Sequence, residues 1–173
     1  MTAALFPTAM TPRFGSSLMA MLAAAVLFLL PGMAHADDGL RSVTRLRITV
    51  ATGGDDLRNA SHAVAAIKYV GLSGNQLTAS INLNNGARWP DWTSHTVTMV
   101  TPTGMLLANL VEFSIQFTSG QPDIFATGDN WNMNAITVTA VLDDGTEAVI
   151  IQQADNYLHR FWSDHDTRWA TAL

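Results

Sequence analysis

Acidic and amide side chains gather in two loop-like segments of the sequence, and they are the oxygen ligands that hard cations prefer. Asp55 and Asp56 follow a pair of glycines, and Asp129 and Asn130 follow Gly128. Calcium takes roughly six to eight oxygen ligands from carboxylates, amides and backbone carbonyls. The two segments therefore predict a calcium site if they meet in space. The alternative is structural, because aspartates in turns accept backbone N–H bonds and stabilise the turn.

Two arginines in or beside these segments are candidate ligand-binding residues. Arg58 closes the first acidic segment, and Arg88 lies in a segment between two predicted strands. A guanidinium can stack on an aromatic ring or bind a carboxylate through two hydrogen bonds. We favour the structural interpretation, in which these arginines fasten loops by pairing with Asp55, Asp56 or Asp91.

Tryptophans form a third set of candidates. Trp89 and Trp92 flank Pro90-Asp91, so an exposed indole at either position would offer a flat face to a sugar ring or a lipid surface. The alternative is that the tryptophans fill the ends of the core, since each indole brings a large apolar area. For Trp131, which begins a predicted strand, we expect the core position.

The sequence contains no recognisable catalytic motif. There is no cysteine, no H-E-x-x-H zinc motif and no G-x-S-x-G nucleophile turn. We therefore expect a protein that is not an enzyme and assign no catalytic residue. A small secreted hydrolase that uses Asp55 and Asp129 as paired carboxylates is an alternative that the sequence leaves open.

The N-terminus has the three regions of a secretory signal peptide. Arg13 is the only charged residue before an unbroken apolar run from Leu18 to Leu30, and Ala34-His35-Ala36 fits a cleavage site. The run is short for a membrane span, which needs about 20 apolar residues. We expect residues 1–36 to be removed and residues 37–173 to form a single secreted or periplasmic domain that is not an integral membrane protein. The alternative is that the segment stays attached as an N-terminal anchor.

The charge of the mature chain excludes one class of partner. Residues 37–173 carry eight basic and 14 acidic residues, whereas nucleic-acid binding needs clustered cations. We therefore expect no nucleic-acid partner.

Alternation of apolar and polar residues dominates the mature chain and is typical of strands with one wet face. In the segment 111–117, Val111, Phe113, Ile115 and Phe117 would face one side, and the polar residues between them the other. Similar patterns predict strands over 45–50, 63–70, 77–83, 95–100, 111–117, 136–142, 146–152 and 157–161. We expect the polar C-terminal segment 164–169 to lie over the sandwich. About eight short strands without a helical period predict an all-β fold, an antiparallel β-sandwich.

Three segments carry a resemblance to a known family. They read T-G-x-D-D-L-R over 52–58, L-N-x-G-x-x-W over 83–89, and D-N-W-x-M-x-x-I-x-V over 129–138. In their order and spacing they resemble bacterial secreted domains related to the PLAT/LH2 (polycystin-1, lipoxygenase, alpha-toxin) β-sandwich.

The resemblance implies a binding or docking module whose partner is a lipid surface or a protein. It also implies that calcium is a candidate ligand at the loops of one end. A lipid-docking module needs an apolar loop tip, for which Leu106-Leu107 and Ile124-Phe125 are the candidates. A carbohydrate-binding module that presents Trp89 and Trp92 to a glycan is the alternative.

Overall fold

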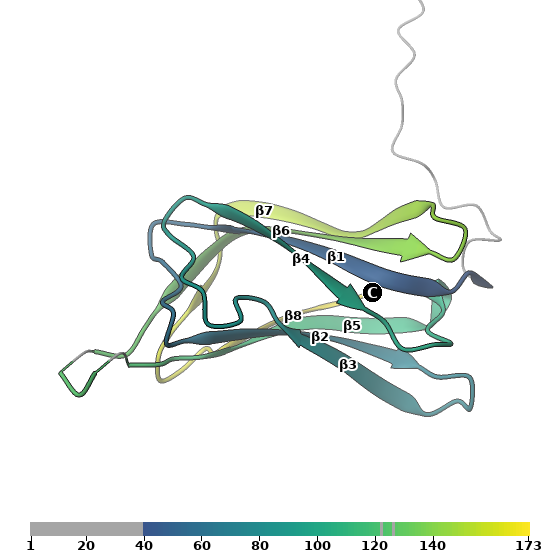
Figure 1. The fold of residues 1–173 in the computed structure, drawn as a ribbon, viewed down its shortest axis with the longest axis horizontal. Helices are drawn as coiled ribbons and strands as arrows, with labels where there is room; N and C mark the ends of the chain where they lie inside the picture. Colours follow the sequence, from purple (N-terminus) through teal and green to yellow (C-terminus); the bar gives the residue numbers. More distant parts are fainter. Residues whose placement is uncertain (1–39, 122, 126) are drawn as a thin grey trace, which may run out of the picture. The chain divides into compact units, whose positions relative to one another are not determined.

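Eight strands form two four-stranded antiparallel sheets that face each other across one apolar core (Figure 1). The structure is a computed structural model that describes residues 40–173 except 122 and 126. The predicted signal peptide lies outside the described residues, all of which belong to one compact unit. The predicted all-β antiparallel sandwich is confirmed.

The first sheet has the strand order β4-β1-β6-β7. β1 spans Val43–Thr52, β4 Ser94–Val100, β6 Trp131–Leu142 and β7 Glu147–Phe161. β1 lies between β4 and β6 and pairs with both in antiparallel register. β4 and β7 are therefore the edges of this sheet.

The second sheet has the order β3-β2-β5-β8. β2 spans His62–Val70, β3 Gln76–Asn82, β5 Leu110–Thr118 and β8 Arg168–Ala172. A single 3₁₀ turn over Leu107–Asn109 precedes β5, and no helix in the described part of the chain is long and apolar enough to cross a membrane.

The core is made by the alternating side chains that the sequence places on the inner faces. Ile48 of β1, Phe113 of β5 and Val138 of β6 are all fully buried. The intervening residues of β1, and those of β6 after the buried Asn132, are at least partly exposed, as expected for sheets with one wet face. Burial of such side chains is the main favourable term in folding and contributes roughly 1.5–3 kcal/mol for each large one.

Three sequence-based expectations are wrong in detail. Residues 157–161 do not form a separate strand but are the last part of β7. The eighth strand is instead β8, in a segment expected to be a polar cover. The alternating pattern also predicts Leu77 in the core, yet it is 44 % exposed at the start of the edge strand β3.

A large bulge interrupts the pairing of β7 with β6. Met133 pairs with His159 and Ala135 with Ala154, so Asp155–Leu158 lie opposite Asn134 alone. Bulges of this kind bend an edge strand and leave the extra residues unpaired.

Four loops come together at one end of the sandwich because successive strands run in opposite directions. They are residues 53–61, 83–93, 119–130 and 162–167. We call this set the loop end; it lies at the left of Figure 1, where the loop between β5 and β6 extends beyond the strands.

Candidate functional site

The loop end is organised around the buried carboxylate of Asp129. Asp129 is fully buried, its Oδ2 atom accepts the backbone N–H of Arg58 at 3.0 Å, and its Oδ1 atom lies 3.2 Å from Nε of Arg58. The Asp129 N–H in turn donates to Oγ of Ser119 at 2.6 Å. Burial raises the pKa of Asp129, and the hydrogen bonds and the Arg58 charge oppose that shift. One aspartate thus joins the loop 53–61 to the loop 119–130.

A second arginine, Arg160 at the end of β7, joins two further segments. Its Nη2 atom donates to Oδ2 of Asp55 at 2.8 Å, and its Nη1 atom donates to Oδ1 of Asn132 at 2.9 Å. The guanidinium also lies over the ring of Trp162, 4.4 Å from the ring centre. Burial raises the pKa of Asp55, and the charge of Arg160 opposes it. Arg160 is not among the site residues assigned from the sequence, although an arginine beside aromatic residues can stack on a ring or bind a carboxylate. Here it does both.

The loop 83–93 is fastened to the loop 53–61 by both side chain and backbone. Arg88 forms an ion pair with Asp56, and Leu57 and Trp89 exchange backbone hydrogen bonds of 3.0 and 2.8 Å. Both arginines fasten loops by pairing with acidic residues, as the structural interpretation expected, but one of them pairs with a different acid. Arg88 pairs with Asp56, as that interpretation allowed, whereas Arg58 pairs with Asp129 instead of an acid of its own segment.

The segments that hold Asp55 and Asp129 do meet, but their side chains do not form a calcium site in this arrangement. Each of Asp55, Asp56 and Asp129 is paired with a different arginine, and Oδ1 of Asn130 accepts the N–H of Ser163 at 2.9 Å. Among the described residues, no three His, Cys, Asp or Glu side chains converge so as to hold a metal ion. Calcium wants several oxygens around one point, and the present donor set does not fit that requirement.

The tryptophans of this end differ sharply in exposure. Trp89 is only 3 % exposed, stacks on His95 with ring centres 4.5 Å apart, and meets the edge of Trp131. The expectation that Trp89 could offer a face to a ligand is therefore corrected, because the indole fills the end of the core. Trp131 is fully buried, as expected.

Trp92 remains available at the surface. Its side chain is 71 % exposed, its ring lies against Gly54, and its backbone N–H donates to the carbonyl of Gly53 at 3.0 Å. The backbone of Trp92 has a φ of 58°, which is uncommon for a residue with a large side chain. This conformation presents the indole outward beside the Asp55 segment.

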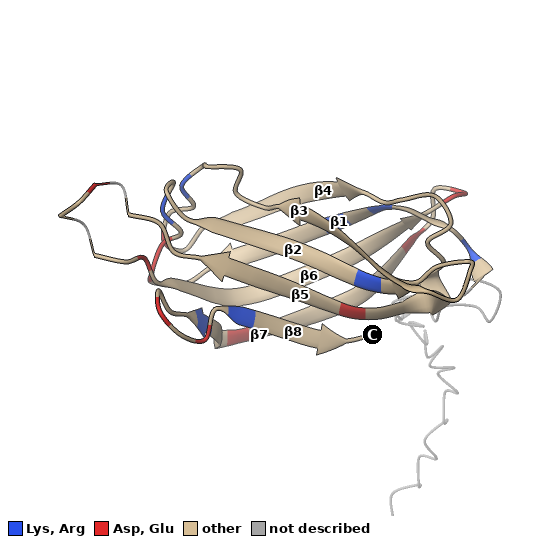
Figure 2. Cartoon of the chain, turned by 90° about the horizontal axis from the view of Figure 1, so that it is seen from below, with Lys and Arg blue, Asp and Glu red and all other residues tan. Residues whose placement is uncertain are grey.

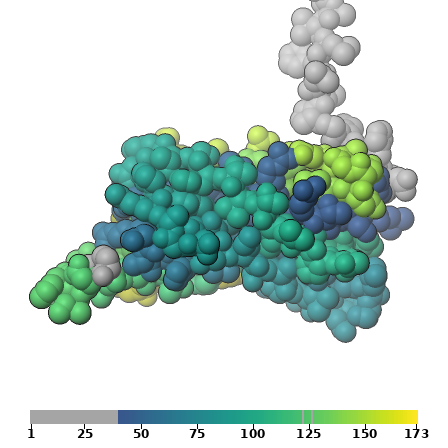
Figure 3. All heavy atoms as spheres, in the orientation of Figure 1, coloured from purple at the N-terminus to yellow at the C-terminus, as the bar shows by residue number. Residues whose placement is uncertain are grey.

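The loop 119–130 carries the most exposed large apolar side chains of the loop end. Ile124 is 88 % and Phe125 90 % exposed, and the loop extends away from the sandwich in Figure 3. Leu106 and Leu107, the other predicted loop tip, lie at the opposite end and are half-buried. Of the two predicted tips, only Ile124-Phe125 stands free in solvent.

The loop end is acidic despite its arginines. The four loops contain seven carboxylates and two arginines, and Arg160 at the end of β7 adds a third cation. Figure 2 shows acidic and basic residues at this end, with an acidic residue on the extended loop. A surface of this composition carries a net negative charge, which repels other anionic surfaces.

Comparison with known proteins supports the fold. No protein-family model matches the chain, and no curated protein matches it. Two solved structures are similar. One is the alpha-toxin of Clostridium perfringens from avian strain SWCP, with a TM-score of 0.52, 16 % identity, and coverage of 80 % of this chain and 33 % of the toxin. The other is the alpha-toxin of Clostridium absonum, with a TM-score of 0.53, 11 % identity, and coverage of 79 % of this chain and 32 % of the toxin.

The chain thus spans about a third of the length of each toxin. At such low identity the likeness concerns the fold alone. The shared feature is the β-sandwich architecture, in agreement with the two antiparallel sheets described above.

Proposed function

We propose that this protein is a secreted or periplasmic, non-enzymatic docking module that contacts a lipid surface through its loop end. The observation that carries the proposal is the pair of adjacent, almost wholly exposed apolar side chains, Ile124 and Phe125, at the outer part of an extended loop. Single exposed apolar residues are common on protein surfaces. Two adjacent large ones on a loop that extends from a fastened base are what an insertion tip requires.

The base of this loop gives the tip a defined position. Asp129 and Ser119 stand at the two ends of the loop and are joined by a hydrogen bond of 2.6 Å. Nη1 of Arg58 donates to the carbonyl of Thr127 at 3.2 Å. Because these contacts hold the base in place, docking does not have to order it, which lowers the entropic cost of binding.

The size of the tip sets the strength of docking. Transfer of one large apolar side chain from water is worth roughly 1.5–3 kcal/mol, so Ile124 and Phe125 together supply about 3–6 kcal/mol. Trp92, at the same end, adds an indole of the kind enriched at membrane interfaces. This strength fits reversible contact with a surface and not permanent insertion.

The charge of the loop end indicates which lipid surface it fits. The excess of carboxylates over arginines disfavours anionic lipids, since those attract clustered cations. We therefore expect docking on zwitterionic vesicles and weaker docking when anionic lipid is added. The three arginine–aspartate pairs stabilise the loops without a metal, so calcium is not required in the proposal.

Cosedimentation with phosphatidylcholine vesicles tests the proposal. The mature protein should sediment with the vesicles, equally well in calcium and in a chelator, and a double Ile124→Ser, Phe125→Ser variant should stay in the supernatant. The matched control is Leu72→Ser, Val149→Ser, which also removes two exposed apolar side chains but at the opposite end of the sandwich. It should sediment like the parent protein.

Two results would contradict the proposal. One is a parent protein that stays in the supernatant with vesicles of every composition. The other is a double variant at Ile124 and Phe125 that sediments as well as the parent.

A further inference from the structure

One arginine of the described chain has no acidic partner. Of the eight basic residues in residues 40–173, seven form ion pairs with Asp or Glu, and Arg45 does not. Arg45 lies on the outer face of β1, where its cross-strand neighbours are Val100 and Val141. The sequence has 14 acidic and nine basic residues, so an unpaired cation is unexpected and is a candidate for binding a ligand.

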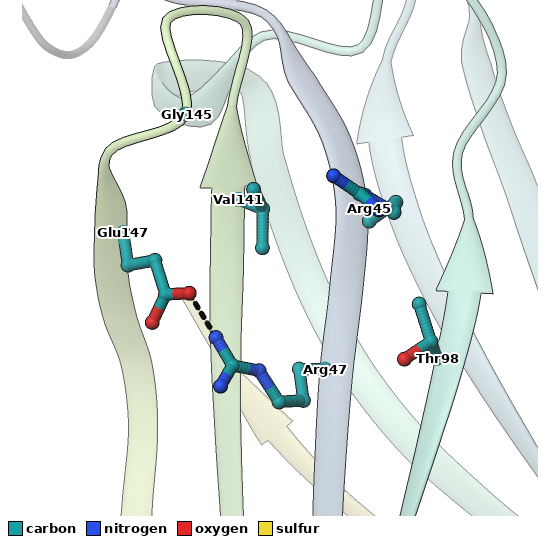
Figure 4. Close-up of a pocket in the computed structure, with 6 residues that line it drawn as sticks. All are labelled: Arg45, Arg47, Thr98, Val141, Gly145 and Glu147. Atoms are coloured by element: carbon teal, nitrogen blue, oxygen red, sulfur yellow. Dashed lines mark hydrogen bonds and ion pairs between the residues drawn. The ribbon is translucent and has the colours of Figure 1, made fainter.

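A shallow depression of about 280 Å³ surrounds this arginine (Figure 4). It is lined by Arg45, Arg47, Thr98, Val141, Gly145 and Glu147. The two acids of the adjacent turn, Asp143 and Asp144, are already paired with Arg41, and Glu147 is paired with Arg47. The acids at the rim are therefore neutralised, and the positive charge of Arg45 is the one available to an incoming anion.

Hydroxyl groups continue from the depression across the face of the sheet. The register places Thr96, Thr49 and Thr137 side by side on β4, β1 and β6. The next row along the same strands holds Thr98, Arg47 and Thr139. Neighbouring strands are about 4.8 Å apart, so the threonines form a regular array of donors and acceptors beside the unpaired cation. At least one pair in it, Thr49 and Thr96, is close enough to share a hydrogen bond of 2.9 Å.

We infer that this outer face of β4, β1 and β6 binds an acidic oligosaccharide, with a sugar carboxylate on Arg45 and sugar hydroxyls on the threonine rows. A guanidinium binds a carboxylate through charge-assisted hydrogen bonds. A threonine hydroxyl both donates and accepts, as sugar hydroxyls do. Val100 and Val141 on either side of Arg45 give the C–H faces of a sugar ring an apolar contact. The site lies on a different surface from the loop end and does not depend on lipid docking.

The class of ligand is inferred from Arg45 together with the threonine rows, and not from the arginine alone. A simple anion such as phosphate would use Arg45 and leave the threonine rows unused. A neutral oligosaccharide would use the rows and leave the cation unpaired. Only a ligand with both an acid group and many hydroxyls uses both parts of the surface.

Calorimetric titration with trigalacturonate at low salt tests the inference, with cellotriose and inorganic phosphate as comparison probes. The parent protein should bind trigalacturonate at least tenfold more tightly than either comparison probe. Arg45→Gln should weaken trigalacturonate binding about tenfold or more, which is the effect of losing one charge-assisted contact. Thr98→Val should weaken it several-fold and leave the response to phosphate unchanged.

Lys68→Gln is the matched control, because it removes one partly exposed cation from the outer face of the other sheet. It should bind trigalacturonate like the parent. The inference is overturned if the parent does not bind trigalacturonate, if Arg45→Gln binds it as tightly as the parent, or if phosphate binds equally well with the same dependence on Arg45.

Discussion

Arg58 and Asp129, which are 71 positions apart in the sequence, are joined by two contacts at the loop end. The Arg58 backbone N–H donates to one carboxylate oxygen at 3.0 Å, and Nε of its side chain lies 3.2 Å from the other. The aspartate is fully buried, whereas the guanidinium reaches the surface. This pair therefore links the apolar loop tip to the first loop of the sandwich.

Loss of this carboxylate should destabilise the fold. In Asp129→Ala the Arg58 N–H loses its partner, and we expect a decrease of about 1–3 kcal/mol in the free energy of unfolding. Urea titration followed by tryptophan fluorescence measures the change. The control is Asp91→Ala, an exposed carboxylate in the loop 83–93, which should change stability by less than about 0.5 kcal/mol. Equal stability of the two variants would show that the buried contacts are not needed.

The contribution of Asp129 to the free energy of unfolding should change with pH in a definite direction. Burial raises the folded-state pKa of Asp129 above its ordinary value of 3.8, so its contribution to stability is fully present below that value. The contribution is lost as pH rises through the folded-state pKa. The amide side chain of the Asp129→Asn variant does not titrate, so the stability deficit of this variant relative to the parent should be largest near pH 4 and shrink toward pH 7.

Urea titrations of the parent and of Asp129→Asn at several pH values measure this difference. Shifts at other groups, such as the lowered pKa of Glu112, are shared by both proteins and cancel in the comparison. A deficit that grows between pH 4 and pH 7 would contradict the predicted direction.

Calcium should not stabilise the protein. A cation that bound only the folded state would raise the melting temperature by mass action. Because Asp55, Asp56 and Asp129 are each held by an arginine, we expect melting curves in millimolar calcium and in a chelator to coincide. A rise of several degrees in calcium, absent from Asp55→Asn, would show that the loops rearrange to bind the ion.

Truncation of the two tryptophans that flank Pro90-Asp91 should reduce stability to very different extents. Trp89→Ala removes a buried indole that stacks on His95, and a cost of about 3–5 kcal/mol is expected. Trp92→Ala removes an exposed one and should cost less than about 1 kcal/mol. Thermal unfolding of both variants makes the comparison, and a small cost at Trp89 would be inconsistent with its position in the core.

Strand periodicity is sufficient to predict the sandwich, because most strands have one buried and one wet face. The pattern of Ile48, Phe113 and Val138 can be read without knowing which strands pair. Prediction from alternation fails for strands that do not have one buried and one wet face. β8 has one large buried side chain, Trp169, and so no period to detect. Leu77 alternates correctly but lies at the start of the edge strand β3, whereas Ala79 and Ile81 further along the same strand pack against the core.

The candidate site is less predictable than the fold. The sequence identifies Asp55, Asp129 and Arg58 as loop residues, but which carboxylate each arginine meets depends on how the loops fold back on one another. The burial of Trp89 has a similar cause. It is set by the backbone pairing with Leu57, which local sequence does not encode. The exposed pair Ile124-Phe125 is recognisable because apolar residues stand there between turn residues and outside any alternating pattern.

The bulge of Asp155–Leu158 has a consequence for solubility at high concentration. A long edge strand offers a ready template onto which a second chain can add, and β7 is the longest strand in the described part of the chain. The unpaired bulge residues interrupt that edge, so a second molecule cannot form continuous strand pairing along the whole length of β7. Deleting the four residues would restore a continuous edge and should make the protein prone to forming fibrils.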